Sequence, residues 1–488
     1  MSDSSTSRPL VLVCVIVAMI MVALEATIVS TAMPQIAGQL GGLDLYSWVF
    51  AGFLLTQTAT TVVFGKLSDL FGRKPVMLFG IAVFLIGSIL AGLAWSMPSM
   101  IVFRLIQGVG AGSIQPIGMT IVGDLYSARE RGKVQGFLAS VWGISAVLGP
   151  LAGGLIIQRW SWAWIFWINV PIGILAAAGF IVFLKEGVAR RSMPIDIAGA
   201  ALFTVAVASL MVSLTEYGTS DYTGTTLGLA LFVVSFLLFI RQERRAQDPI
   251  VTLGLWGQRP IAAANGVSLL AGMAVIGLTT FLPVYVQGVL QQSPLVAGFA
   301  LTMMVMGWPI GATLAARILG RFGLRPVLIC GASLLPVGAL FFLSLHPASS
   351  PVVAGMGSLV MGFGMGLLST ACLVLVQDIV DWAQRGSATA SNIFSRNLGS
   401  TLGATVFGAV LNYGLAHSKT GAIAPEALRK LLNDPSGSAA VGDGIRSVLQ
   451  ASLHLTFWAV FVVSVLAVLL ALAVPPVSLD RVSEAAAE

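Results

Sequence analysis

Fourteen runs of apolar residues, each close to the length that crosses a lipid bilayer, dominate this chain. A spanning helix needs about 20 such residues, because hydrocarbon offers backbone polar groups no hydrogen-bond partners. Only 9% of the 488 residues are charged, against roughly 25% in soluble domains. We therefore expect an all-α polytopic membrane protein with 14 transmembrane helices. The expected spans are 10–32, 46–67, 76–95, 99–123, 134–157, 163–184, 195–216, 226–240, 261–286, 295–317, 327–345, 352–376, 387–411 and 453–474.

Basic residues gather in alternate loops between these runs. Lys66, Arg73 and Lys74 follow the second run, whereas the short loops on the opposite side carry only Arg159. The positive-inside rule then places both termini in the cytoplasm. This loop pattern, rather than an affinity for nucleic acid, accounts for the net charge of +6. We expect a multi-pass protein of the plasma membrane, which is the inner membrane in a bacterium, and no nucleic-acid partner.

A charged hinge from Gly65 to Pro75 separates the second and third runs, and its frame returns 251 positions later, from Ala316 to Pro326. Three glycines of the fourth run recur in the twelfth at an offset of 254: Gly108, Gly110 and Gly112 match Gly362, Gly364 and Gly366. Two independent matches at nearly one offset indicate an internal repeat.

The repeat divides the chain into two halves and an insert. We expect a six-helix bundle in residues 1–190, two inserted linker helices in 191–258, and a second six-helix bundle in 259–488 with a long extracellular loop at about 412–452. Parallel repeats of this kind are typical of transporters, whose substrate site lies near mid-membrane between the halves.

The hinge and the end of the fourth run form an expected inner gate of Gly65, Asp69, Gly72, Arg73 and Asp124. Gly72 suits a backbone with positive φ. Asp69 can accept hydrogen bonds from a helix N-terminus or an Arg, and Asp124 is a plausible partner for Arg73. Exposed ion pairs contribute about 0 to 1 kcal/mol each, so such a cluster can close and open.

Glu25 is the only ionisable residue of the first run. A charge at that depth costs roughly 2.5 to 3.5 kcal/mol, so the side chain must face protein or a water-filled cavity. Because burial disfavours a charged carboxylate, we expect Glu25 to take up and release protons. The alternative is a structural acid that is hydrogen-bonded to a neighbouring helix.

Arg104 enters the fourth run near its outer end. A guanidinium group stays charged, so it can bind an anion or bias a nearby carboxylate towards proton release. Arg104 is therefore our second candidate for proton coupling. The alternative is a side chain that extends to the outer membrane interface.

The fifth run is unusually rich in helix-weakening residues. Proline removes a backbone hydrogen bond and kinks a helix, while glycines allow tight packing at the bend. These residues are Gly143, Gly149, Pro150, Gly153 and Gly154.

Aromatic and polar residues within the runs are candidates for a substrate cavity, although most aromatic residues of a membrane protein face lipid or neighbouring helices. Arg396 could hold substrate, or could pack against Asp378 or Asp381. One acid in the first half favours cationic substrates, whereas Arg104 and Arg396 keep anions possible. The candidates are Glu25, Phe53, Gln57, Gln115, Trp142, Asn265, Phe281, Tyr285, Trp308 and Arg396.

Catalytic motifs are missing from the sequence. It contains no nucleophile elbow, no phosphate loop and no His or Cys spacing typical of metal sites. Cys14, Cys330 and Cys372 all lie in apolar runs, so we expect neither disulfides nor a metal site. The chain is not expected to be an enzyme.

Several motifs resemble those of a known family. The hinge, Gly-Lys-Leu-Ser-Asp-Leu-Phe-Gly-Arg-Lys-Pro, resembles the signature loop of the major facilitator superfamily. The segment from Arg104 to Gly112 resembles that family's fourth-span motif, and Gly149 to Gly154 resembles the fifth-span signature associated with antiporters. Leu24 to Pro34 and Trp162 to Gly173 are similar to the fourteen-span drug:proton antiporters.

The resemblance implies the major facilitator fold, with 14 helices arranged as 6+2+6 in two pseudo-symmetric bundles. It implies alternating access and proton-driven export of small hydrophobic, often cationic compounds, as in multidrug efflux. We expect protons to be the coupling ion and no other cofactor to be needed. The lipid bilayer would be the surrounding partner, and the protein would work as a monomer. It would make Asp69, Arg73 and Asp124 a charge cluster at the inner gate, and Arg104 a participant in proton transfer.

The chain departs from the family pattern at three places. The first-span motif usually has Asp where this chain has Glu25, which keeps the carboxylate but lengthens its reach. Ala163 stands where Arg is common, and Gly320 stands opposite Asp69 in the second hinge. These differences place the expected proton machinery in the first half.

Other functions fit the same fold, because fold alone does not settle direction or cargo. An uptake symporter, a dedicated exporter of a single metabolite and a non-transporting membrane sensor are the alternatives. A respiratory proton pump would need a chain of intramembrane Lys and Glu residues, which this sequence does not contain.

Overall fold

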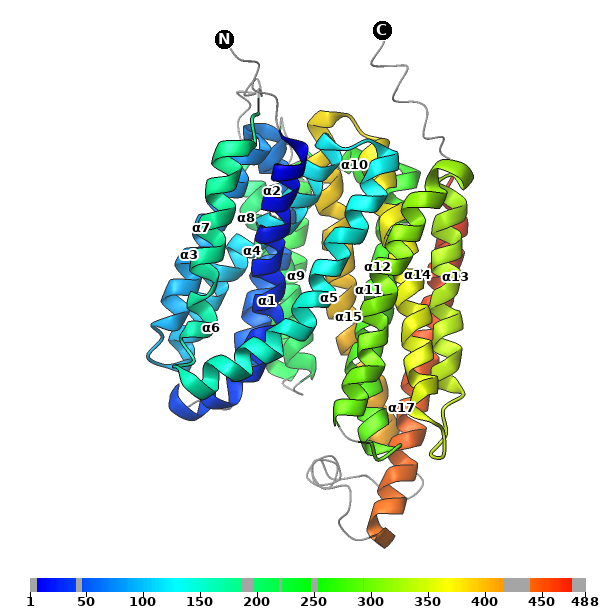
Figure 1. Cartoon of the computed structure of the whole chain (residues 1–488). Helices are drawn as coiled ribbons and strands as arrows, with labels where there is room; N and C mark the ends of the chain where they lie inside the picture. The colour runs from blue at the N-terminus through cyan, green and yellow to red at the C-terminus, as the bar shows by residue number, and fades with distance from the viewer. Residues whose placement is uncertain are drawn as a thin grey trace, which may run out of the picture.

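The computed structural model describes residues 7–40, 46–186, 196–218, 222–246, 253–292, 294–416 and 439–475. Over these ranges the chain is built of helices that run side by side in one bundle (Figure 1). The first half contains α1 (Arg8–Leu40), α2 (Tyr46–Phe71), α3 (Arg73–Gly92), α4 (Met97–Leu125), α5 (Ala128–Arg159), α6 (Trp164–Trp167) and α7 (Asn169–Phe183).

The insert and the second half continue the same pattern. The insert contains α8 (Ile197–Gly218), α9 (Tyr222–Glu243) and the short α10 (Leu253–Gly257). The second half contains α11 (Arg259–Gly288), α12 (Pro294–Phe322), α13 (Leu324–Leu343), α14 (Pro351–Asp378), the 3-10 helix η2 (Trp382–Gln384), α15 (Arg385–Ala416) and α17 (Ala439–Leu472).

Each of the fourteen expected runs overlaps a helix, with α6 and α7 together matching the sixth, and five of the runs extend one to three residues beyond the helix they match. Among the described residues, eleven helices are long and apolar enough to cross a membrane. The three others are α15 and two helices with shorter apolar stretches, α5 and α8. The chain is thus a multi-pass membrane protein, while the count of fourteen spans stays a prediction. The eighth run, expected at 226–240, is shorter than the helix found there, because α9 begins earlier, at Tyr222, and continues to Glu243.

The two hinges share one backbone conformation. Gly72 has φ 96° and Gly323 has φ 80°, and each immediately precedes a helix, α3 or α13. No other glycine among the described residues has positive φ. The prediction of positive φ at Gly72 is confirmed. We call the end of the bundle that carries these glycines the hinge end, and the opposite end the far end.

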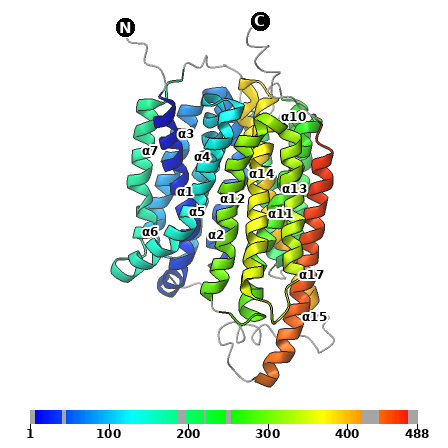
Figure 2. The same ribbon diagram turned by 45° about the vertical axis from the view of Figure 1, so that its right-hand side comes forward.

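The repeated glycines give both halves the same internal packing. Gly108 and Gly112 let α4 approach the backbone of α2, and Gly362 and Gly366 let α14 approach the backbone of α12. The middle glycine of each set faces α3 or α13 in the same way. Figures 1 and 2 show α14 beside α12 and α13.

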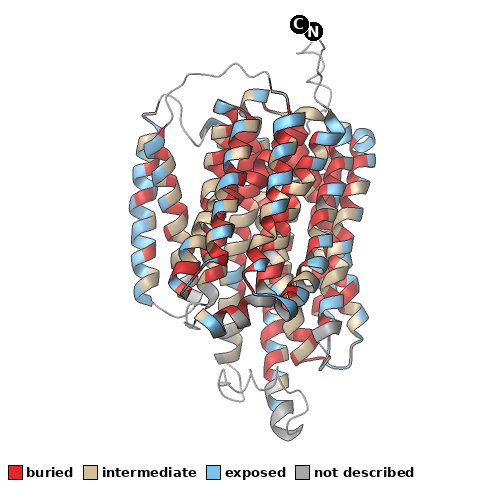
Figure 3. Cartoon of the chain, turned by 60° about the vertical axis from the view of Figure 1, so that its left-hand side comes forward, coloured by how far each residue is buried: buried red, intermediate tan, exposed pale blue. Residues whose placement is uncertain are grey.

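The insert packs against both halves. The Phe203 ring of α8 lies 5.5 Å from Phe394 of α15 and 5.3 Å from Phe239 of α9, measured between centroids. Leu55 of α2 belongs to the same buried cluster, so α8 covers the line along which α2 meets α15. The outer faces of the helices are exposed while their inner faces are buried (Figure 3). On α9 the exposed side chains include Leu227 and Leu237, as lipid contact requires.

Candidate functional site

A cavity of about 750 Å³ lies between the two halves. Helices α1, α2, α4 and α5 line it from the first half, and α11, α12, α14 and α15 from the second. Met211 adds a side chain from α8, so the insert also contributes. The volume falls within the range of about 300 to 1,000 Å³ that is usual for small-molecule sites.

The cavity wall is mostly apolar and aromatic, with a polar strip on α15. Its apolar side chains include Val22, Phe53, Met119, Leu138, Trp142, Ile276, Met304, Trp308 and Leu373. The polar strip consists of Asn392, Arg396, Asn397, Ser400, Thr401 and Thr405. Among the lining residues, Arg396 alone has an ionisable side chain. The chemistry of the wall therefore suits a greasy molecule with one polar or charged group.

Six of the ten cavity residues expected from the sequence line this cavity: Phe53, Gln57, Gln115, Trp142, Trp308 and Arg396. The other four, Glu25, Asn265, Phe281 and Tyr285, do not line it. Phe281 and Tyr285 are 5% and 0% exposed within the core of the second half, where the Tyr285 hydroxyl donates to Leu345 O at 2.9 Å. Asn265 is 2% exposed and donates to Ser391 Oγ at 3.0 Å.

Glu25 is the fourth of these residues, and it faces the interior of the first half instead. It is 0% exposed and is bound by the Arg104 guanidinium group, which itself is 1% exposed. Asn169 Nδ2 of α7 donates to the other carboxylate oxygen at 2.5 Å. Arg104 also donates to Gln107 Oε1 at 2.7 Å. This arrangement neutralises and hydrogen-bonds an acid whose burial would otherwise be costly.

Phe53 connects the buried ion pair with the cavity. Its ring centroid lies 4.3 Å from Arg104 Cζ, within the distance for a cation–π contact. The same side chain lines the cavity. A change in the pairing of Glu25 and Arg104 can therefore reach the cavity wall through a single side chain.

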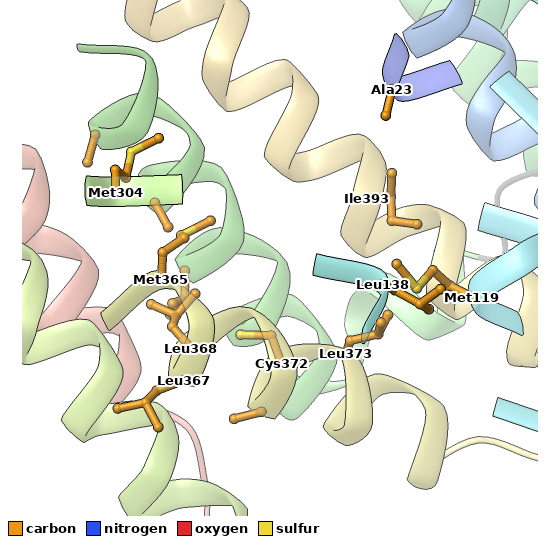
Figure 4. Close-up of a cluster of buried hydrophobic side chains, with 14 of the residues drawn as sticks. Ala23, Met119, Leu138, Met304, Met365, Leu367, Leu368, Cys372, Leu373 and Ile393 are labelled. Atoms are coloured by element: carbon orange, nitrogen blue, oxygen red, sulfur yellow. The ribbon is translucent and has the colours of Figure 1, made fainter. Parts of the chain in front are cut away.

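The hinge end of the cavity is closed by apolar side chains from both halves. Met119 of α4 and Leu138 of α5 lie close to Leu373 of α14, and Ile393 of α15 extends towards them (Figure 4). All four residues line the cavity. They form the floor that separates it from the hinge end.

Beyond this floor, Asp69 of α2 binds the N-terminus of α15. Its carboxylate accepts from Gly386 N at 2.9 Å, from Ser387 N at 2.8 Å and from Ser387 Oγ at 2.8 Å. Arg73 Nη1 lies 3.1 Å from the same carboxylate. The first N–H groups of a helix have no partner within the helix and carry its positive dipole end. Asp69 thus joins the two halves at the hinge end.

Arg73 is held by acceptors from both halves. Its Nε donates to Asp124 Oδ2 at 3.0 Å, which is the partner expected from the sequence, and its Nη2 donates to Trp382 O at 2.8 Å. Asp124 also accepts from Arg385 Nη1 at 2.8 Å. Gly65 adds a close approach, because a Cβ there would lie 2.9 Å from Gly386 O. The five gate residues are thus brought together with the start of α15.

Glu186 is a further member of this cluster that the sequence did not reveal. Its carboxylate accepts from Arg73 N at 2.7 Å and from Lys74 N at 2.8 Å, which caps the N-terminus of α3. Arg131 is another, because it donates to Gly123 O at 2.7 Å and lies 3.9 Å from Asp378. Burial, with the Arg385 charge nearby, lowers the pKa of Arg131 to about 10, so it stays charged at neutral pH.

The glycines of α5 fit it against two different helices. Gly143 faces Val305 of α12, whereas Gly149 faces Thr27 of α1, whose hydroxyl donates to Ser145 O at 3.0 Å. Beyond that point α5 leans away from α12 towards α6 (Figure 1). Gly153 is buried. For Pro150 and Gly154, only their place within α5 is described.

The sequence matches the family model of the Major Facilitator Superfamily over residues 15–404. It is 36% identical over 408 residues to "Multidrug resistance protein 3" of Bacillus subtilis (strain 168). This match covers 83% of this chain and 80% of that protein. It is 34% identical over 415 residues to "Multidrug transporter protein MdtP" of the same organism, covering 83% and 76%.

The fold resembles the crystal structure of the human organic anion transporter MFSD10, with a TM-score of 0.67 at 17% identity, covering 96% of this chain and 100% of that one. An identity this low bears on the fold alone. The family match and the two bacterial relatives identify a transporter and not an enzyme. The chain belongs to the Major Facilitator Superfamily.

Proposed function

We propose that this protein exports lipophilic compounds in exchange for protons, by exposing its cavity alternately to the two sides of the membrane. The observation that carries the proposal is the buried Glu25–Arg104 pair, which touches the cavity wall through Phe53. The printed names of the bacterial relatives, a multidrug resistance protein and a multidrug transporter, support drug efflux.

The proton step proposed here takes place at the Glu25 carboxylate. Protonation removes the negative charge that holds Arg104, while Asn169 still hydrogen-bonds the neutral acid. Arg104 then keeps Gln107 Oε1 and Val49 O as acceptors. Because its guanidinium group packs on Phe53, loss of the ion pair changes the wall against which a substrate rests. Proton binding and substrate binding are coupled through that wall.

The alternating step proposed here breaks the contacts at the hinge end. In this structure Asp69 and Asp124 hold the start of α15, and the halves separate along α5 and α12 towards the far end (Figure 1). That geometry supports a form closed at the hinge end. The pairs were expected to be exposed, but Asp69 and Arg73 are buried in this form. Breaking one pair alone would leave a buried charge unpaired, which is costly, so the proposed opening exposes the charges of the cluster to water together.

The proposed orientation places the hinge end in the cytoplasm, because its loops carry Lys66, Arg73 and Lys74. Both termini would then be cytoplasmic, and the plasma membrane is the proposed location. We propose the fourteen-span arrangement of 6+2+6 helices, with the proton as coupling ion and the monomer as the working unit. The lining of the cavity contains no acidic residue, so a cationic substrate would find no carboxylate there, although a preference for cations was expected.

The proposal is tested in proteoliposomes with an imposed pH gradient. Neutral, cationic and anionic lipophilic dyes are offered, and at least one should move against the proton flow. Glu25→Gln should abolish gradient-driven movement while binding persists, and Glu25→Asp should retain part of it because the carboxylate is kept. Dye movement that ignores the gradient, or an unchanged Glu25→Gln protein, would overturn proton coupling at this site.

A further inference from the structure

We infer that Arg396 forms an anion-binding subsite in the cavity, and that the exported class includes amphipathic organic anions. Such a compound has an apolar ring body and a carboxylate, sulfonate or sulfate group. The inference rests on the proposed export function, because it specifies the charge of the cargo.

The charge of the cavity wall is the first argument. The lining contains no Asp, Glu, Lys or His, and its single ionisable side chain is the Arg396 guanidinium group. The acid that suggested a cationic cargo, Glu25, is outside the lining and bound by Arg104. A substrate in this cavity therefore meets one fixed positive charge and no fixed negative charge.

The lack of a counter-ion for Arg396 is the second argument. Asp378 was one expected partner, but among the described residues its ion pair is with Arg131 at 3.9 Å. Asp69 and Asp124 are engaged at the hinge end with Arg73 and Arg385. No ion pair in the described part of the chain includes Arg396. A charge within a membrane-spanning helix is costly, and this one is not neutralised by the protein.

The direction of the guanidinium group is the third argument. None of the side-chain hydrogen bonds of the described residues uses its nitrogens, yet they are not among the buried polar atoms that lack a partner. Because Arg396 is only partly buried and lines the cavity, we place these nitrogens at the cavity surface. Gly272 of α11 packs directly against the Arg396 backbone, where a Cβ would collide with the carbonyl group. This contact holds the Arg396 backbone against α11. It involves no side-chain atom of Arg396, which can therefore extend to the cavity.

The surroundings of Arg396 complete a site for an anion with a ring body. Asn397 lies beside it in the lining and can donate from its amide, while a guanidinium group binds planar oxyanions through two parallel hydrogen bonds. Trp142, Trp308 and Phe53 line the same cavity and offer aromatic surface for the body of the molecule. A lipophilic cation would find the same aromatic surface but would be repelled by Arg396.

The test compares three probes with one ring system: pyrene-1-sulfonate, 1-pyrenemethylammonium and 1-pyrenemethanol. Binding to the purified full-length protein in detergent is measured by equilibrium dialysis. The sulfonate should bind the unmodified protein about tenfold or more tightly than the ammonium, as a charge-assisted hydrogen bond implies. Arg396→Gln should weaken sulfonate binding by about tenfold or more and leave the neutral alcohol within about twofold. Arg396→Lys should restore part of the sulfonate affinity.

The neutral alcohol separates a charge effect from a folding effect. Equal weakening of all three probes by Arg396→Gln, or equal binding of sulfonate and ammonium to the unmodified protein, would overturn the inference. Transport of the same probes under a pH gradient separates the two proposals. Arg396-dependent sulfonate binding without gradient-driven movement leaves the anion subsite standing and removes proton-coupled export. Gradient-driven export of the ammonium probe that Arg396→Gln leaves unchanged supports proton-coupled export and counts against the anion subsite.

Discussion

The Arg104 guanidinium group of α4 donates to the Glu25 carboxylate of α1, and both side chains are closed off from solvent. The two charges neutralise each other within the first half, about one side chain away from the cavity. This pairing explains how a chain that is so apolar along α1 can accommodate an acid there.

The Glu25–Arg104 pair should show strong coupling in stability. Removal of one partner from a buried pair leaves an unpaired charge, which typically costs about 3 to 5 kcal/mol. Glu25→Gln and Arg104→Gln should each lower the unfolding temperature in detergent. The double variant should lose much less than the sum of the two single losses. Unfolding can be followed with a thiol-reactive dye once the exposed Cys330 is replaced, because Cys14 and Cys372 are buried. Additive losses would contradict the pairing.

Asp69→Asn should open the hinge end. The Asp69 carboxylate accepts from Gly386 N and Ser387 N, and the neutral amide of Asn lacks its negative charge. Hydrogen bonds to a charged group contribute about 1.5 to 3 kcal/mol each. A cysteine placed at the buried Thr389, in a protein without its native cysteines, should react about ten times faster with a soluble maleimide after Asp69→Asn. Ser387→Ala removes one neutral donor and should have a smaller effect. Equal rates in all three proteins would remove Asp69 from the gate.

The two hinge glycines provide a matched comparison. Backbones with φ and ψ like those of Gly72 and Gly323 are essentially restricted to glycine, so Ala at either position should cost about 1 to 3 kcal/mol. A Cβ at Gly72 would also lie 2.9 Å from Glu186 Oε2, whereas nothing lies within 4 Å at Gly323. Gly72→Ala should therefore be the more destabilising in the thiol-dye assay. Equal losses, or the reverse order, would mean that the Glu186 contact does not add to the cost of the substitution.

Gly149→Ala should separate α5 from α1, because the added Cβ would collide with Thr27. We expect a loss of transport with retained expression, since small residues at helix contacts allow close approach within membranes. Gly298→Ala on α12 is the control, because no atom lies within 4 Å of its added Cβ. Dye efflux from cells that express each variant measures the difference. Equal efflux by the two variants would leave the α1–α5 contact without a role in transport.

Membrane potential should distinguish an anion cargo from a cation cargo. Export of one monovalent anion against one proton moves two charges per cycle, whereas export of one monovalent cation moves none. Each charge gains about 2.3 kcal/mol per 100 mV. Efflux of pyrene-1-sulfonate from loaded vesicles should therefore accelerate under a potassium diffusion potential that is negative inside. An indifferent rate would contradict this charge balance.

Sequence reasoning reached features that one residue type or one repeat determines. Positive φ at Gly72 followed from glycine alone, and the match with Gly323 followed from the repeated frame. The partnership of Arg73 with Asp124 followed from two opposite charges at neighbouring helix ends. Such features depend on local chemistry and on the order of helices, both of which are visible in the chain.

Features that depend on which side of a helix faces inward were less accessible. Tyr285 and Phe281 lie on α11, whose apolar residues are spread around the helix, so their spacing does not separate a cavity face from a core face. The binding of Glu25 by Asn169 joins positions 144 residues apart, and a single sequence does not specify that approach. Asn169 was nevertheless visible as a polar residue in an apolar run.

The position of α8 has a consequence for how molecules reach the cavity. A lipophilic compound dissolved in the bilayer needs no aqueous route if two helices part beside the cavity. Along α2 and α15, however, α8 places Phe203 against Phe394 and Met211 at the cavity wall. On that flank the insert lies between the cavity and the outer surface of the bundle, so a version of this chain without α8 should leave the cavity wall there facing the hydrocarbon.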